Sequence, residues 1–280
     1  MFEIVEKRVL SPVVNLFKVK APLIAKKRKP GQFVIFDVDE RGERVPLTIA
    51  DADPEEGTVT IICQAIGKST IKLNSLNKGD KILSFVGPLG VPSHIEKFGT
   101  TICIGGGVGI AVAYPLAKAL KNEGNYVISI MGFRSKELLF MEEDLRATSD
   151  ELHITTDDGT YARKGLVTDV LQEILADGRV VDFVLAVGPV PMMKAVCNIT
   201  KKYKIKTMVS LNPIMVDGTG MCGACRVTIG GQTKFVCVDG PEFNGHMVDF
   251  DELMKRQSIY KEQERISIEK LQHEECCQTR

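Results

Sequence analysis

The chain has 280 residues, of which 44% are hydrophobic and 26% are charged, and its 36 basic residues balance 36 acidic ones. This composition excludes wholesale disorder, and the length suggests about two domains, since a domain commonly has about 100–200 residues. A net charge of zero lacks the basic excess typical of nucleic-acid binders, so we expect no nucleic-acid partner.

The first residues carry charges at Glu3, Glu6 and Lys7 and do not have the pattern of a signal peptide. Residues 98–117 contain no charge, but their five glycines and Pro115 favour a strand-to-helix turn over a membrane span. Eight cysteines in a chain without a signal peptide argue against a disulfide framework. We therefore expect a cytoplasmic protein with no membrane partner.

Residues 1–98 read as short strands that are separated by turn signals such as Pro30-Gly31 and Gly79-Asp80. Several short strands at this spacing, interrupted by one helix, predict a small antiparallel β-barrel. We expect strands at 4–10, 13–19, 32–37, 46–50, 58–65 and 81–86, and the helix at 69–76.

Residues 99–211 alternate between apolar strands and amphipathic helices, and this order predicts an α/β domain with a parallel sheet. Cys63, Cys103 and Cys197 lie in apolar runs and are predicted to be buried. We expect strands at 101–104, 126–131, 152–155, 183–187 and 207–211, and helices at 112–120, 136–146, 167–175 and 190–202.

A glycine-rich turn follows the first strand of this second domain and opens a helix. Such a turn offers backbone N–H groups and a helix N-terminus to a phosphate, although a purely structural tight turn is the alternative. The dinucleotide fingerprint is incomplete, because Val112 stands at its last glycine and Arg134, not an acid, follows the next strand. The choice between NAD and NADP therefore stays open. The turn consists of Gly105, Gly106, Gly107, Val108 and Gly109.

Residues 212–248 are rich in glycine and cysteine and include a predicted hairpin at Gly230-Gly231. Three cysteines and one aspartate there follow the C-x4-C-x2-C spacing of plant-type [2Fe–2S] sites, with the aspartate in the first position. Glycines at 218, 220 and 223 favour a cluster, because the backbone must wrap closely around it. A redox disulfide and a zinc site completed by His246 are the alternatives. The four expected ligands are Asp217, Cys222, Cys225 and Cys237.

Residues 249–280 are charged and predicted to be helical, as an appendage and not a part of the core. This tail is either a docking element or a solvated helix. Cys276 and Cys277 within it carry no readable role.

Four motifs, GGGVGIA, GFRS, TDDGT (156–160) and VGPVPMM (187–193), resemble the nucleotide domain of ferredoxin-NADP reductase-like flavoproteins. The resemblance implies a barrel FAD domain at 1–98, an NAD(H) domain at 99–211, a [2Fe–2S] segment at 212–248 and a tail at 249–280. Besides the glycine turn, it implies nucleotide contacts from Arg134, Asp157, Gly188 and Met192; a solvated turn is the alternative for Asp157 and Asp158. The implied FAD-binding residues are Arg44, Val45, Pro46, Leu47, Thr48, Gln64, Ala65, Gly67, Lys68, Ser69 and Thr70.

The run NPIMVDGTGMCGACRV (212–227) is similar to the alpha subunit of NADH-dependent reduced ferredoxin:NADP oxidoreductase, including the aspartate ligand. The resemblance implies that electrons pass between NAD(H), FAD and the cluster, and to or from a larger subunit that bifurcates electrons with its own flavin and clusters. The alternatives are the electron-transfer subunit of heteromeric dihydroorotate dehydrogenase, which uses four cysteines, and a zinc-stabilised nucleotide-binding module without redox turnover.

Overall fold

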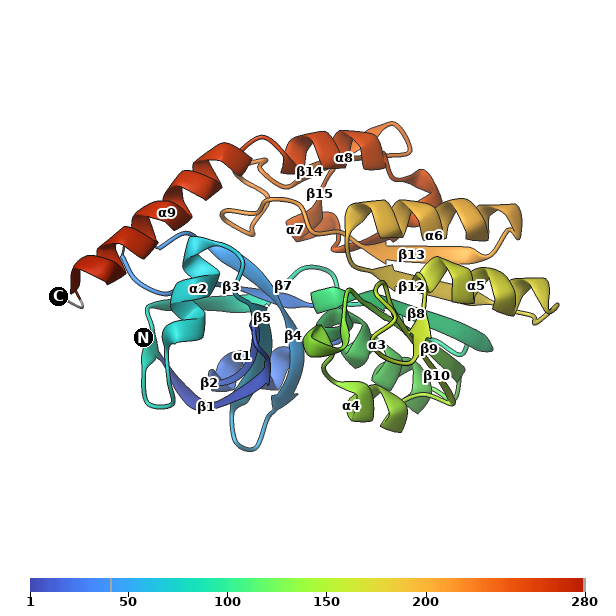
Figure 1. Ribbon diagram of the computed structural model, residues 1–280, viewed down its shortest axis with the longest axis horizontal. Coiled ribbons are helices and arrows are strands. Elements are labelled where there is room, and N and C mark those ends of the chain that lie inside the picture. The colour runs from blue at the N-terminus through green and yellow to red at the C-terminus, as the bar shows by residue number, and fades with distance from the viewer. Residues whose placement is uncertain (41, 279–280) are drawn as a thin grey trace.

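We describe the chain from a computed structural model, which covers residues 1–40 and 42–278 and the side chains of these residues except 272 and 274–278. A barrel made of N-terminal residues lies beside a helix-covered sheet, and the C-terminal residues run across both (Figure 1). None of the helices in the described part of the chain combines the length and the apolar composition needed to cross a bilayer.

The first sheet confirms the predicted antiparallel barrel. Its strand order is β6-β1-β2-β5-β4-β3-β7, and because Leu83 alone separates the edge strands β6 and β7, the sheet curls into a nearly closed barrel. A short helix, α1 (Pro22–Lys27), was not expected from the sequence. The other elements are β1 (Phe2–Ser11), β2 (Val14–Lys20), β3 (Phe33–Asp37), β4 (Val45–Asp53), β5 (Thr58–Gln64), α2 (Lys68–Ser75), β6 (Lys81–Ile82) and β7 (Ser84–Leu89).

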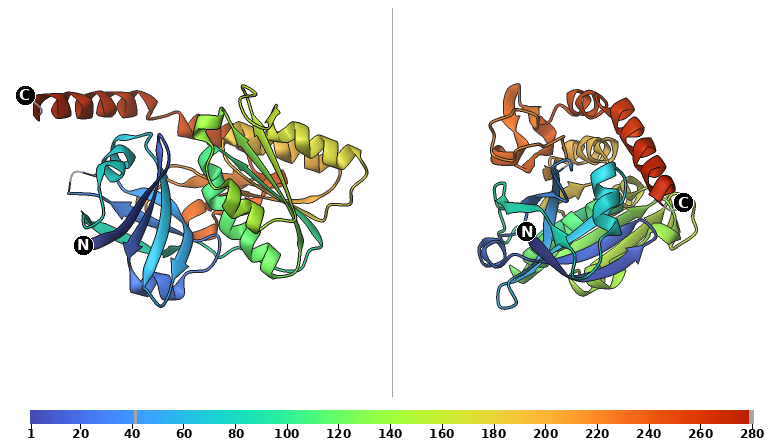
Figure 2. Two further views of the ribbon diagram at one scale, coloured as in Figure 1. Left: turned by 60° about the horizontal axis from the view of Figure 1, so that its bottom comes forward. Right: turned by 90° about the vertical axis from the view of Figure 1, so that its left-hand side faces the viewer.

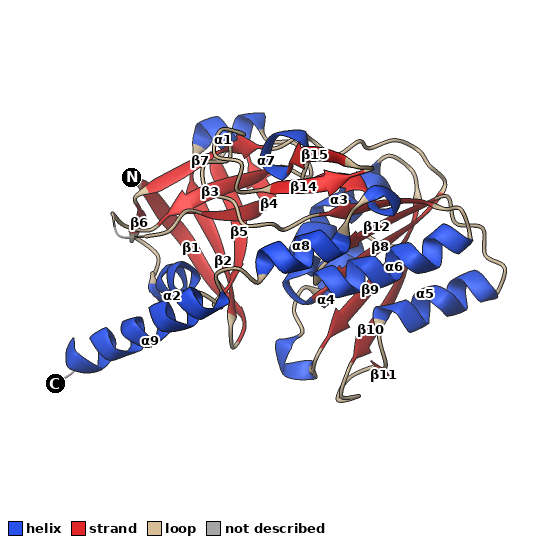
Figure 3. Ribbon diagram, turned by 90° about the horizontal axis from the view of Figure 1, so that it is seen from above, coloured by secondary structure: helices blue, strands red, loops and turns tan. Residues whose placement is uncertain are grey.

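The second sheet has the order β11-β10-β9-β8-β12-β13-β16, and all its neighbouring strands are parallel except β13 and β16. Helices α3 and α4 cover one face, while α5 and α6 lie together on the other (Figure 3). The elements are β8 (Thr100–Gly106), α3 (Ile110–Asn122), β9 (Tyr126–Phe133), α4 (Glu142–Ala147), β10 (Glu151–Thr156), β11 (Arg163–Lys164), α5 (Val167–Ala176), β12 (Phe183–Val187), α6 (Val190–Lys202) and β13 (Lys206–Ser210).

The prediction of one continuous helix at 136–146 is wrong. A 3₁₀ turn at Lys136–Leu138 and α4 take its place, because Met141 between them adopts a left-handed backbone with φ of 60°. The break lets Phe140 turn inward, where its ring packs edge-on against Phe133 with 5.6 Å between centroids. Burial of that aromatic ring outweighs the continuation of a helix whose remaining residues are mostly exposed.

The C-terminal residues are built into the molecule. The predicted hairpin at Gly230-Gly231 is present, and the strand β16 adds to the edge of the second sheet beside β13. The elements are β14 (Arg226–Ile229), β15 (Gln232–Phe235), α7 (Val236–Asp239), β16 (Glu242–Asn244), α8 (Phe250–Gln257) and α9 (Lys261–Gln278).

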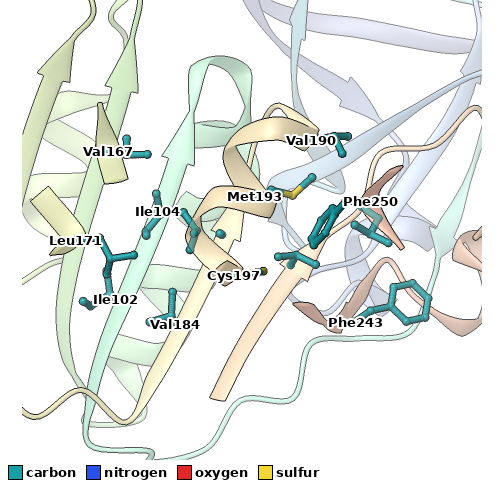
Figure 4. Close-up of a cluster of buried hydrophobic side chains, with 14 of the residues drawn as sticks. Ile102, Ile104, Val167, Leu171, Val184, Val190, Met193, Cys197, Phe243 and Phe250 are labelled. Atoms are coloured by element: carbon teal, nitrogen blue, oxygen red, sulfur yellow. The ribbon is translucent and has the colours of Figure 1, made fainter. Parts of the chain in front are cut away.

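One hydrophobic core joins all three parts. It includes Phe33 and Ile35 of the barrel together with Cys225 and Cys237 of the C-terminal segment. Figure 4 shows side chains of the second sheet and of α6 meeting Phe243 and Phe250 from that segment. The C-terminal segment is therefore held by the same buried contacts that hold the two larger domains.

The expectation that residues 249–280 form an appendage is wrong for α8, because Phe250 and Leu253 are 6% and 1% exposed and belong to the shared core. Helix α9 continues past the core and lies against α2 of the barrel, where Leu271 is buried (Figure 2). The last two residues of the expected tail, 279–280, lie outside the described residues.

Candidate functional site

A cavity of about 960 Å³ lies between the barrel and the second sheet. Its walls come from β4 and β5 on the barrel side and from residues at the carboxyl ends of β8, β9, β10 and β12 on the other. In parallel sheets ligands bind at this edge, and a cavity of this size accommodates an extended cofactor.

Most of the predicted nucleotide-binding residues and part of the predicted flavin-binding residues meet in this cavity. The barrel contributes Pro46, Leu47, Thr48 and Gln64 to its lining, and the second sheet contributes Gly106, Gly107, Val108, Gly109, Arg134, Asp157, Gly188 and Met192.

The other predicted positions lie outside the cavity lining. Gly105 is buried beneath the turn, where a Cβ would lie 2.4 Å from Cδ1 of Ile110. Arg44 is exposed, whereas Ser69 is buried at 4% exposure. The positions outside the lining are Arg44, Val45, Ala65, Gly67, Lys68, Ser69, Thr70 and Gly105.

The two segments that are expected to bind the FAD pyrophosphate, 44–48 and 67–70, nevertheless lie close together. Ser69 in the first turn of α2 accepts a hydrogen bond of 3.1 Å from the backbone N–H of Glu43, which places Arg44 beside that turn. Thr70 has a structural role, because its hydroxyl accepts the N–H groups of Gly67 at 2.9 Å and of Ile66 at 3.1 Å. These bonds cap α2 and orient its N-terminus toward the loop that carries Arg44.

The glycine turn after β8 requires glycine for two reasons. Gly107 has a φ of 54°, a left-handed value that glycine adopts readily. At Gly106 a Cβ would lie 2.5 Å from Sδ of Met192, and at Gly109 a Cβ would lie 2.4 Å from the carbonyl oxygen of Val187. The turn therefore packs directly against the residues that follow β12, and the start of α3 faces the cavity.

Arg134 and Asp157 follow the neighbouring strands β9 and β10, and both line the cavity. The backbone N–H of Asp157 donates to the carbonyl of Phe133 at 3.0 Å, which sets the two positions side by side. The carboxylate of Asp158 instead accepts two hydrogen bonds from Thr160, and these lower the pKa of Asp158. The structure thus separates two adjacent aspartates, since Asp157 faces the cavity and Asp158 closes its own turn.

The four expected metal ligands lie in two pairs. The thiol of Cys222 donates to Oδ1 of Asp217 at 3.1 Å, and Sγ of Cys225 lies 3.2 Å from Sγ of Cys237. Hydrogen bonds from Cys222 and Thr219 hold the pKa of the Asp217 carboxyl well below its usual range, while burial, together with Cys225, raises the pKa of Cys237 to about 12.

The arrangement of these residues is compatible with a cluster of two irons. Two pairs of donors suit two irons, each bound by two protein ligands. The N–H of Cys237 lies 3.4 Å from Sγ of Cys225, and backbone donors of this kind stabilise anionic sulfur.

The zinc alternative is not supported, because His246 lies away from the cysteines. Its Nε2 is 3.0 Å from the hydroxyl of Thr200 on α6. Burial, and to a smaller extent Lys201, lowers the pKa of His246. The histidine is therefore a packed side chain between α6 and the residues that follow β16.

The loop that carries Asp217, Cys222 and Cys225 packs on the barrel, whereas Cys237 lies in α7. Gly218 has a φ of 78°, and a Cβ there would lie 2.6 Å from Cδ1 of Ile35 on β3 and 2.9 Å from Cδ1 of Leu89 on β7. The sequence predicts the four ligands but not this contact, and it does not predict the apolar cavity walls at Val14 and Phe140. No local signal marks those two residues, since apolar side chains are common both in strands such as β2 and in the turn before α4.

Comparison with known proteins is consistent with this geometry. Residues 212–249 match the family model of the iron-sulfur cluster binding domain of dihydroorotate dehydrogenase B. A Clostridium beijerinckii protein described only as uncharacterized is 51% identical, covering 94% of this chain and 92% of its own. A Thermotoga maritima homolog of the dihydroorotate dehydrogenase B (NAD(+)) electron transfer subunit is 49% identical, covering 96% and 94%. The Geobacillus thermodenitrificans electron transfer subunit itself is 34% identical, covering 86% and 94%.

Among solved structures, a chain of NADH-dependent reduced ferredoxin-NADP oxidoreductase, studied for flavin-based electron bifurcation, is 48% identical with a TM-score of 0.92. The match covers 97% of this chain and 98% of that one. The reductase of carbazole 1,9a-dioxygenase is 20% identical with a TM-score of 0.63 and covers 73% of this chain and 64% of that one. This second likeness shows the ferredoxin reductase-like fold.

Proposed function

Because the chain belongs to the family of dihydroorotate dehydrogenase B electron-transfer subunits and their homologues, we propose that it passes electrons between NAD(H), FAD and a [2Fe–2S] cluster to or from a larger partner subunit. The observation that carries the proposal is the shared cavity, whose walls join the flavin-type barrel to the glycine turn of the second sheet. The loop with Asp217, Cys222 and Cys225 packs on β3 and β7 of the same barrel.

The three cofactors have complementary chemistry, since a nicotinamide supplies two electrons as hydride, a flavin exchanges electrons singly or in pairs, and an iron–sulfur cluster carries one. The chain itself binds and orients them. The glycine turn and the start of α3 bind nucleotide phosphates through backbone N–H groups, and Asp157 and Arg134 bind the nucleotide where β9 and β10 end. Gly188 and Met192 border the nicotinamide.

The barrel binds FAD. Pro46, Leu47, Thr48 and Gln64 line its side of the cavity, and the N-terminus of α2 with Arg44 binds the pyrophosphate. The positive end of the α2 dipole and the Arg44 guanidinium both favour an anion there. Asp217 and Cys222 hold one iron of the cluster, and Cys225 and Cys237 hold the other.

Exposed apolar side chains beside the ligand loop support docking of the larger subunit there. Val216 is 48% exposed, Met221 is 89% exposed and Val238 is 41% exposed. Apolar groups of this size gathered around one loop are typical of a surface that another protein covers. We place the partner's electron donor or acceptor on this side, next to the cluster.

We favour the partner of an NADH-dependent ferredoxin-NADP oxidoreductase, which bifurcates electrons, over a dihydroorotate dehydrogenase partner. The identity of 48% over 97% of the chain exceeds the 34% over 86% found with the Geobacillus subunit. A cytoplasmic location is also proposed, because Cys63, Cys103 and Cys197, which lie outside the ligand set, are free thiols and such thiols persist in a reducing compartment.

The absorption spectrum and the metal content of the purified heteromer test the cofactor set. We expect flavin and ferric–sulfide absorption, two irons per chain above those of the partner, and no zinc. Cys225→Ala should remove the iron of this subunit, whereas Cys197→Ala, a matched change of a buried cysteine outside the ligand loop, should retain it. Zinc in place of iron would refute the redox proposal.

The substrate of the complex tests the partner. The heteromer should oxidise NADPH while it reduces NAD⁺ and an oxidised ferredoxin-type protein together, and it should not oxidise dihydroorotate. Oxidation of dihydroorotate would instead identify the alternative partner and leave the cofactor set unchanged.

A further inference from the structure

Two consecutive residues at the end of α8 hold two distant points of the ligand loop. Nη2 of Arg256 donates to the carbonyl oxygen of Ala224 at 3.0 Å. Nε2 of Gln257 donates to the carbonyl oxygen of Asn212 at 2.8 Å and to its Oδ1 at 3.2 Å. Asn212 also lines the cofactor cavity, so α8 connects the cavity wall to the loop that carries Asp217, Cys222 and Cys225.

Helix α8 is fixed well enough to serve as a support. Phe250 and Leu253 are buried in the shared core. The side chain of Asp249 caps the helix by accepting the N–H of Glu252 at 2.9 Å, and the carboxylate of Glu252 accepts the N–H of Thr228 on β14 at 3.1 Å. Its position is therefore set by packing and by capping, independently of the ligand loop.

The carbonyl group to which Arg256 donates lies between two of the expected cluster ligands. Ala224 stands between Cys222 and Cys225, directly after Gly223, which has a φ of 69° and, without a side chain, restricts this part of the backbone little. A hydrogen bond to the Ala224 carbonyl fixes the peptide plane whose N–H belongs to Cys225. Arg256 is half-buried, so its positive charge is less screened by solvent than that of a surface side chain.

We propose that Arg256 is a positioning residue for the iron–sulfur cluster, which orients the Cys222–Cys225 backbone and holds a positive charge beside the anionic ligand set. The inference rests on the proposed function, since it assumes that Asp217 and the three cysteines bind a cluster. Net charge and hydrogen bonding around the ligands set the reduction potential of such clusters. Loss of the guanidinium makes the addition of an electron less favourable, so the potential should become more negative.

Arg256→Met tests the proposal, because it removes the donor and the charge and keeps an apolar stem of similar length. Lys255→Gln is the matched control, since it removes one charge from the neighbouring, exposed position of α8. We expect a more negative midpoint potential in Arg256→Met than in Lys255→Gln. In Arg256→Lys, which keeps the positive charge, the potential should lie close to that of the parent protein. The potential is measured by EPR-monitored titration of the purified heteromer.

A second readout follows the backbone directly. Hydrogen–deuterium exchange of residues 217–225 should be faster in Arg256→Met than in the parent protein and unchanged in Lys255→Gln. Loss of the cluster from Arg256→Met, with the cluster retained in the control, supports the proposal equally. A parent-like potential together with parent-like exchange in Arg256→Met would overturn it, as would an equal potential shift in the control.

If Arg256→Met does not fold, Arg256→Gln takes its place, because it keeps an N–H donor and loses the charge. Its midpoint potential and its hydrogen–deuterium exchange are measured in the same way. Absence of any [2Fe–2S] signal from the parent heteromer would instead refute the proposed function. The two failures are therefore distinguishable.

Discussion

Gly188 approaches Gly106 so closely that a Cβ on Gly188 would lie 3.1 Å from the Cα of Gly106, at the point where β12 and β8 end side by side. The same Cβ would lie 2.8 Å from Cε of Met192. Both glycines line the cavity, so their lack of side chains shapes the space in which we place the nicotinamide.

Gly188→Ala should therefore weaken nucleotide binding. The added methyl group displaces Met192 or separates the two strand ends, and we expect the KM for NADH to rise about tenfold, equivalent to about 1.4 kcal/mol. The flavin content should stay at the parent level, because the barrel wall is unchanged. Steady-state kinetics with an artificial electron acceptor measures the effect, and an unchanged KM would show that the nucleotide binds elsewhere.

Asp217→Cys should retain a [2Fe–2S] cluster with a shifted potential and an altered EPR spectrum. A carboxylate oxygen is a harder donor than a thiolate and shares less electron density with ferric iron. Asp217→Ala should weaken or lose the cluster, while hydride transfer from NADH to FAD should survive in both variants. If spectrum and potential in Asp217→Cys both equal those of the parent protein, Asp217 is not a ligand.

Thr70→Val should destabilise the barrel by about 1 kcal/mol, because it leaves the N–H groups of Gly67 and Ile66 without their acceptor. Ser75→Ala on the same helix is the control, since the exposed Ser75 hydroxyl only donates to the carbonyl of Lys72. Urea unfolding of the two variants measures the difference. Equal stabilities would indicate that the cap does not contribute.

Glu242→Gln should change how stability depends on pH. Burial raises the pKa of Glu242 above its ordinary value of 4.5, and a hydrogen bond from Ser93 offsets only part of this effect. The folded protein thus binds the proton more tightly than the unfolded chain does, so the parent loses stability as pH rises from about 4.5 to the raised pKa.

The glutamine variant lacks this proton and should be more stable than the parent at neutral pH. The difference should vanish below about pH 4.5, where the glutamate is protonated in both states. Urea unfolding between pH 4 and pH 8 tests the effect, which parallel stability profiles of the two proteins would contradict.

Local sequence determined much of the fold. The strand at 183–187 and the helix at 190–202 are found with the predicted bounds, because an uninterrupted apolar run and a helical period each specify their own structure. Cys63, Cys103 and Cys197 are buried as expected from their apolar neighbours. The cysteine-rich spacing also predicted an iron–sulfur segment at 212–248, and residues 212–249 match an iron-sulfur cluster binding domain.

Other features depended on contacts between residues far apart in the chain. The helix expected at 136–146 is broken because Phe140 packs against Phe133, and the side chain of His246 contacts Thr200 on α6. The sequence also gives no sign that Arg256 reaches Ala224, a residue 32 positions earlier.

The sequence by itself therefore determined most of the strands and helices and predicted which four residues bind a cluster, because periodicity and short spacing are local properties. Only the tertiary structure decided that Asp157 faces the cavity while Asp158 closes its turn, and that the ligand loop packs on the barrel. The physical reason is that two adjacent residues have nearly the same sequence neighbours. Their side chains nevertheless meet different surroundings in the fold, because segments far away in the chain pack against them.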